Sequence, residues 1–171
     1  MRIPTFLKSN LPAQKQNRLF RFNFLNEEMY RRKTAEDGHE IIDKATYNRI
    51  MKPFFKAGGI VQQDEDAIRH LNKVGVSALY INGANTMLLT KTLRVSEVLE
   101  EAFHARQDRA NCFGTMDMNG VVHTMREIEA QQYLLSVTDK YKIPKEETEV
   151  TLRNLIDYQQ HLQTLLRKEN L

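Results

Sequence analysis

Residues 95–108, VSEVLEEAFHARQD, carry the pattern on which both the predicted fold and the predicted site depend. At about 100° per residue, the apolar and small side chains of this segment share one side of a helix: Val95, Val98, Leu99, Ala102 and Phe103. The carboxylates and one imidazole share the other side: Glu97, Glu100, Glu101, His104 and Asp108. The segment therefore predicts an amphipathic helix, over about 95–109, with an unusually acidic polar face.

Two interpretations of this polar face remain open from the residues alone. Charged faces of amphipathic helices are commonly solvated, and that interpretation needs no ligand. Alternatively, Glu100 and His104, one turn apart, are metal ligands, and Glu101 is free to hold a water molecule as general base. The pair Glu101 and His104 also has the E-x-x-H spacing of di-iron bundles, but the second E-x-x-H that those sites need does not occur in the sequence.

The next helical segment offers further candidate ligands. A loop over 110–124 precedes a helix predicted over 125–141, whose start is marked by a capping-box pattern of Thr124 and Glu127. The run from Glu127 to Gln131, which includes Glu129, could supply a third oxygen ligand. His123 is either a spare ligand or an ordinary loop histidine. Arg126 either neutralises the carboxylates or holds a substrate carboxylate or phosphate.

The remaining segments predict a small α+β fold, in which a small sheet with a hairpin is followed by a helical core. The expected elements are an irregular arm (1–25), a short helix (26–33), a helix capped by Asp43 or Thr46 and ended by Gly58 and Gly59, a strand (59–62), a helix between Asp64 and Gly75, a hairpin (77–82 and 86–90) and a last helix (145–169). We expect residues 1–45 to form a basic arm and linker, and residues 46–171 to form a single domain.

Composition and charge narrow the class of protein. With 171 residues, 41% hydrophobic and 27% charged, the chain is long enough for one core, and no apolar run is long enough for a membrane span. The only cysteine, Cys112, cannot form an internal disulfide and is expected to be a packed thiol. Residues 1–25 contain five basic and no acidic side chains, which indicates an arm for nucleic acid or an acidic partner, an import presequence, or a solvated charged segment.

Several motifs resemble known families. VLEEAFHARQ (98–107) resembles the HExxH helix of zincin metallopeptidases, with Glu100 where the first histidine belongs. EIEAQQYLLS (127–136) is similar to the glutamate segment of the ImmA/IrrE-type branch, and this resemblance implies that Glu129 is the third metal ligand. LEEAFHARQDR, REIEAQQYLLSV and YKIP-x-E-E look like a domain at the C-terminus of phage minor head (MuF-like) and toxin-associated proteins, over about residues 58–169.

The resemblance implies a zincin-like domain, associated with a phage or mobile element and located in the cytoplasm or virion. It implies a metal-dependent peptidase or hydrolase with Glu100, His104 and Glu129 around a divalent metal, zinc foremost, and with Glu101 as the catalytic base. The accessory residues would be Glu127, His123 and Arg126. The alternative is a non-catalytic phage structural or binding module that uses residues 1–25 to hold a phage or host protein or a nucleic acid.

Overall fold

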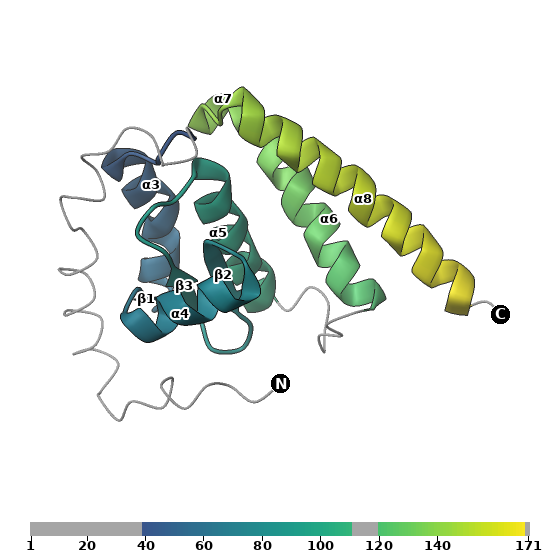
Figure 1. The fold of residues 1–171 in the computed structure, drawn as a ribbon, viewed down its shortest axis with the longest axis horizontal. Helices are drawn as coiled ribbons and strands as arrows, with labels where there is room; N and C mark the ends of the chain where they lie inside the picture. The colour runs from purple at the N-terminus through teal and green to yellow at the C-terminus, as the bar shows by residue number, and fades with distance from the viewer. Residues whose placement is uncertain (1–38, 111–119, 170–171) are drawn as a thin grey trace.

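The computed structural model describes residues 39–110 and 120–169 of the chain (Figure 1). Its elements are α3 (Lys44–Lys56), β1 (Ile60–Gln62), α4 (Glu65–Val74), β2 (Ala78–Ile81), β3 (Thr86–Leu89), α5 (Val95–Ala110), α6 (Val121–Ser136), α7 (Thr138–Tyr141) and α8 (Lys145–Glu169). This small sheet with its helical core confirms the predicted α+β class. None of the helices in these ranges combines the length and the apolar character that a membrane crossing requires.

The sheet has the strand order β1-β3-β2. β2 and β3 form the expected antiparallel hairpin, in which Tyr80 lies opposite Met87, whereas β1 joins β3 in parallel, with Ile60 opposite Thr86. All four residues of the central strand are buried, and the two faces of the sheet have different partners. Leu88 packs against α4, while Met87 and its neighbours on the other face pack against α3 and α5.

Both ends of α3 follow from capping chemistry. The side chain of Asp43 accepts a hydrogen bond from the Thr46 amide at 2.9 Å, so the helix begins at Lys44. At the other end, Gly58 adopts a φ of 77°, and the Gly59 amide donates to the Phe54 carbonyl at 3.0 Å. These are the left-handed residue and the closing bond of a Schellman motif, so the predicted stop at the glycine pair is confirmed.

The body of the fold begins before residue 46. Ile41 and Ile42 are buried, and the amide of Ile42 donates to the Leu93 carbonyl at 2.8 Å. The end of the predicted linker is therefore part of the core. The predicted arm (1–25), the predicted short helix (26–33) and Cys112 lie outside the described residues, so those predictions stay untested.

Two details of the α6 region correct the sequence prediction. α6 begins at Val121 with Gly120 as its cap residue, and the Thr124 hydroxyl donates to the Gly120 carbonyl inside the first turn, so Thr124 does not cap the helix. The helix also ends at Ser136 and not at Tyr141, because the backbone at Val137 leaves helical geometry before the short α7. α8 then runs back along α6 and covers one side of it, as Figure 1 shows. Its bounds confirm the predicted last helix.

Candidate metal centre

The candidate site lies on α5, a helix that is packed between other elements of the fold. It contacts α3, β2 and α6, and its polar side meets both β2, through Glu101, and α6. His104 and Gln107 are buried on that polar side although both are hydrophilic. The acidic face of α5 is thus an interface within the protein and not a solvated surface, so the carboxylates and the imidazole must find partners there.

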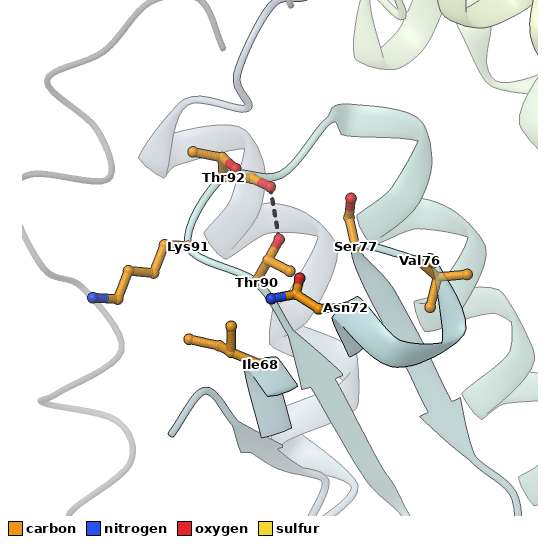
Figure 2. A pocket seen from close by; sticks show the side chains of 8 residues that line it. Ile68, Asn72, Val76, Ser77, Thr90, Lys91 and Thr92 are labelled. Carbon is orange, nitrogen blue, oxygen red and sulfur yellow. Dashed lines mark hydrogen bonds between the residues drawn. The ribbon is translucent and has the colours of Figure 1, made fainter. Parts of the chain in front are cut away.

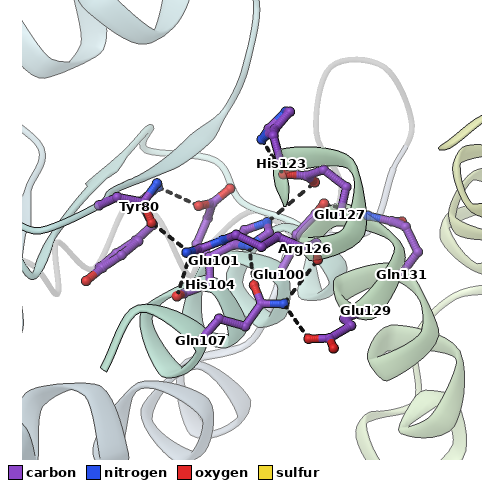
Figure 3. Close-up of polar contacts among 11 residues, drawn as sticks. Tyr80, Glu100, Glu101, His104, Gln107, His123, Arg126, Glu127, Glu129 and Gln131 are labelled. Atoms are coloured by element: carbon purple, nitrogen blue, oxygen red, sulfur yellow. Dashed lines mark hydrogen bonds and ion pairs between the residues drawn. The ribbon is translucent and has the colours of Figure 1, made fainter. Parts of the chain in front are cut away.

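Three side chains of this interface could together hold a metal ion: Glu100 and His104 from α5 and Glu127 from α6. One potential ligand atom from each lies within 4.8 Å of the others. His104 Nε2 and Glu127 Oε2 are 3.5 Å apart, and both side chains are only 11–12% exposed. Figure 3 shows the three side chains between the two helices.

Hydrogen bonds fix the orientation of the His104 ring. Gln107 uses its amide group to donate to the Arg126 carbonyl at 3.1 Å and to Glu129 Oε2 at 3.0 Å. Its Oε1 atom therefore faces the Nδ1 atom of His104, 2.9 Å away, as an acceptor. Since an acceptor requires a donor opposite, Nδ1 carries the hydrogen, and Nε2 is the atom left to bind a cation.

Glu100 is oriented from the other helix. Its Oε1 atom accepts a hydrogen bond of 2.6 Å from the amide of Gln131, which is itself buried on α6. Gln131 lies one turn after Glu127, so the same face of α6 provides both a candidate ligand and a partner for Glu100. Burial raises the pKa of Glu100, and the charge of Glu127 acts in the same direction.

Glu101 has a different environment from Glu100. Its Oε2 atom accepts a short hydrogen bond from the backbone amide of Tyr80 on β2, so the carboxylate is anchored to the edge strand of the sheet (Figure 3). Burial raises the pKa of Glu101 to about 7, and the charge of Glu100 contributes to the rise. His104 and the Tyr80 amide act in the opposite direction.

The imidazole is the main positive charge among these carboxylates. Burial alone would lower the pKa of His104, but its contact with Glu127 and the charges of Glu101 and Glu100 raise the pKa to about 9. For Glu127, burial acts to raise the pKa, but His104 outweighs it and brings the pKa below its usual value. Without a cation, the pair is therefore an imidazolium facing a carboxylate.

The resemblance implied Glu129 as the third ligand, but the group in the structure that could hold a metal contains Glu127 and not Glu129. Glu127, expected as an accessory residue, belongs to the candidate ligand group, whereas Glu129 is exposed and accepts the bond from Gln107. Two residues turn a helix by about 200°, so the two side chains leave α6 on opposite sides, and Glu129 meets α5 only at its hydrogen bond with Gln107. Glu127 lies on the buried side of α6. Its spacing of three, four and seven residues from the buried residues of this helix is the sequence signal that distinguishes it from Glu129. The buried residues on that side are Ala130, Gln131 and Leu134.

The two other accessory residues both lie near the group. His123 Nδ1 is 3.7 Å from Glu127 Oε1, one turn away on α6, and has no hydrogen-bond partner among the described residues. Arg126 is buried, with one nitrogen donating to Asn82 Oδ1 at 2.7 Å and, more weakly, to the His104 carbonyl at 3.4 Å. Arg126 thus ties α6 to the end of the hairpin.

Tyr158 on α8 is a further residue near the group, and the sequence did not indicate it. Burial raises the pKa of Tyr158 to about 12, and the charges of Glu127 and Glu100 raise it as well. The phenol is therefore within electrostatic reach of two members of the candidate ligand group. No local pattern marks this residue, because its position depends on how α8 folds back along α6.

Another hollow lies away from this centre. A cavity of about 610 Å³ opens between α4 and the ends of β2 and β3, and Figure 2 shows hydroxyl and amide groups, the apolar side chains of Ile68 and Val76, and Lys91 around it. The Thr90 hydroxyl donates to the Thr92 carbonyl at 2.9 Å within it. Lys91 is the one charged residue among those that line it.

Compared with protein families, curated proteins and solved structures, the chain gives no match.

Proposed function

We propose that this protein is a metal-dependent hydrolase of the metallopeptidase type. Glu100, His104 and Glu127 would hold a divalent cation, and Glu101 would be the general base. The observation that carries the proposal is the convergence of two carboxylates and one imidazole from two different helices into one buried interface. Like charges are gathered there at a cost in free energy, which a cation between them would offset.

The donor atoms suit a divalent cation. Zinc takes imidazole and carboxylate ligands at about 2.0–2.2 Å, which places tetrahedral ligand atoms about 3.4 Å apart. His104 Nε2 and Glu127 Oε2 already have this separation at 3.5 Å, and no pair in the group is further apart than 4.8 Å, a gap that modest side-chain rotation closes. A set of one nitrogen and two carboxylate ligands also suits manganese or iron. All three metals are therefore tested, with zinc first.

Glu101 has the properties of a general base. Burial raises its pKa to about 7 in the metal-free protein, and a cation held beside it would favour the carboxylate form, which is the form that accepts a proton. The Tyr80 amide fixes one carboxylate oxygen, so the other is available for a water molecule. When bound, the cation would supply Lewis-acid polarisation of a substrate carbonyl, and Glu101 would take the proton of the attacking water.

A phage or mobile-element context is part of the proposal. Its support is the resemblance of LEEAFHARQDR and REIEAQQYLLSV to the C-terminal domain of phage minor head and toxin-associated proteins.

Metal content is the direct test. The full chain is dialysed against zinc, manganese or iron, and bound metal is measured by mass spectrometry. We expect about one ion per chain, with strong loss in His104→Ala and Glu127→Gln. Glu149→Gln is the matched control, because Glu149 is an exposed glutamate on α8 that pairs with Lys145 of the same helix at 3.7 Å. No bound metal under any supply would refute the metal site.

Activity is tested separately with the metal-loaded chain on fluorescent casein and a peptide library. We expect Glu101→Gln to keep its metal and to lose about 10²–10⁴-fold in rate, as for removal of a general base. A Glu101→Gln variant that cleaves at the wild-type rate would exclude Glu101 as the base. A loaded chain with no hydrolysis on any substrate would leave a metal-binding protein and refute the hydrolase.

A further inference from the structure

A second, independent feature lies on another side of α5. A partly open cavity of about 120 Å³ is lined by residues of α3, α5, α6 and α7, and its arginines are exposed at its rim. On α5, its two arginines lie more than 90° around the helix from Glu100 and His104, so the cavity is separate from the candidate metal centre. The polar residues that line it, beside apolar side chains, are Arg49 from α3, Arg106 and Arg109 from α5, and Tyr133 and Tyr141.

The positive charge of this cavity is not balanced by the residues that the structure describes. No acidic residue is among those that line it. Within residues 39–110 and 120–169, none of the three guanidinium groups forms an ion pair with a carboxylate. Asp43 feels the charge of Arg49 but bonds the Thr46 amide instead, and Arg49 donates only weakly to the Lys140 carbonyl at 3.4 Å. Three positive groups around one small cavity attract an anion.

Aromatic rings hold two of the guanidinium groups in place. Arg106 lies over the ring of Phe103 at 4.3 Å and over that of Tyr133 at 4.9 Å, and these two rings stack on each other at 4.6 Å. Arg49 lies over the ring of Tyr141 at 4.6 Å. A guanidinium that stacks through its face can still donate from its edge N–H groups, in a fixed fork that matches an oxyanion.

We propose that this cavity binds a phosphate group. Phosphate presents more charged oxygens than a carboxylate does, so it can accept hydrogen bonds from three arginines at once. Burial raises the pKa of Tyr133, so its hydroxyl stays protonated and can also donate. The volume equals about four water molecules at roughly 30 Å³ each, which admits one phosphate group, with any larger remainder of the ligand outside the opening.

The group can come from inorganic phosphate or from the end of a larger phosphomonoester, and the experiment separates these sources. Inorganic phosphate and O-phosphoserine are titrated into the full chain by calorimetry at fixed ionic strength. We expect one saturable site for inorganic phosphate. Tighter binding of O-phosphoserine would identify the natural ligand as a phosphomonoester, and equal or weaker binding would identify it as the free ion.

The variants distinguish a built site from general charge. We expect Arg106→Gln and Arg49→Gln each to weaken binding at least tenfold, and Arg106→Lys to weaken it as well, because lysine keeps the charge but loses the fork. Arg69→Gln is the matched control, since Arg69 is exposed on α4 and pairs with Asp66. Circular dichroism verifies that each variant is folded.

Two results would overturn the proposal. One is the absence of saturable phosphate binding up to about 10 mM, a concentration that corresponds to a binding free energy of only about −3 kcal/mol. The other is equal weakening by Arg69→Gln and Arg106→Gln, which would mean non-specific attraction to a basic protein. Neither result depends on the metal centre, so the two proposals fail separately.

Discussion

The Nε2 atom of His104 lies 3.5 Å from the Oε2 atom of Glu127, and this contact joins α5, which packs on the sheet, to α6, which pairs with α8. Something positive must occupy the space between two carboxylates and an imidazole in this interface. In the metal-free protein that positive charge is the proton of the His104 imidazolium, whose pKa the contact with Glu127 and the neighbouring carboxylates raise to about 9. A metal ion would replace that proton at the same atom, so proton and metal compete for one position.

Gln107 is expected to control metal affinity without binding the metal. Its Oε1 atom holds the Nδ1–H of His104, and its amide group is anchored by Arg126 and Glu129. Gln107→Leu removes this partner and frees the ring to turn. We expect metal affinity to fall about 10–100-fold, measured by competition with a chelating dye. The matched control is Gln132→Leu, because Gln132 is an exposed glutamine on α6, and equal affinity in both variants would contradict the role of Gln107.

Glu147 is expected to make stability depend on pH. Its Oε2 atom accepts from the Ser96 amide at 2.9 Å at the start of α5, while its Oε1 atom has no partner among the described residues. Burial raises the pKa of Glu147 above its unfolded value, with the Glu97 charge adding to the rise. The stability that this shift contributes is present at low pH and is lost as pH rises through the folded pKa.

Replacing Glu147 by glutamine imitates its protonated form. We therefore expect Glu147→Gln to be more stable than the wild type at pH 7 and similar to it at pH 4, measured by urea unfolding at both values. A difference in the free energy of unfolding that is the same at both pH values would show that burial of the charge has no effect.

Gly59 is expected to tolerate no side chain. A Cβ atom there would lie 2.4 Å from the buried ring of Phe54. We expect Gly59→Ala to lower the free energy of unfolding by about 1–3 kcal/mol, as overpacking does. In a Phe54→Leu background the cost should fall, because the clashing atoms are gone. In Gly58→Ala the new Cβ atom would meet open space, but the residue would have to keep a φ of 77°. The resulting loss of about 1–2 kcal/mol in the free energy of unfolding should therefore be the same with Phe54 or Leu at position 54.

Asp43 is expected to set the start of α3. Asp43→Ala removes the acceptor for the Thr46 amide and should cost about 1 kcal/mol in unfolding by urea, while Asp43→Asn keeps an acceptor and should cost less. The hydrogen bond from Thr46 lowers the pKa of Asp43, so the carboxylate form is the one that caps at neutral pH. Equal loss in the two variants would mean that the charge, and not the cap bond, is responsible.

Local chemistry explains why most elements could be predicted from sequence. Asp64 and Gly75 bracket α4 as cap residues, with Gly75 at a φ of 76°. The hairpin turn has Gly83 and Asn85 at positive φ, as its sequence indicated. These signals act within a few residues of the structure they specify. The parallel pairing of β1 with β3 joins segments separated by a whole helix, and no local pattern encodes it.

The candidate site was predictable only in part, for the same reason. Three of its members, Glu100, Glu101 and His104, share one helix, so their spacing alone placed them together. The contribution of α6 depends on how that helix packs against α5, which no local pattern specifies. The resemblance implied Glu129 as the third member, whereas the group that could hold a metal in the structure contains Glu127. The half-buried Tyr158 of α8 depends on the packing of a third helix and left no trace in the sequence pattern.

The division of the ligand group between α5 and α6 has a mechanical consequence. α5 is fixed to the sheet through the bond between Glu101 and Tyr80, whereas α6 pairs with α8 as a helical hairpin. A cation shared by Glu100, His104 and Glu127 would act as a staple between the hairpin and the rest of the molecule. Binding of the metal ion should then slow amide hydrogen exchange on α6 and α8 more than on α4, which lies on the far face of the sheet.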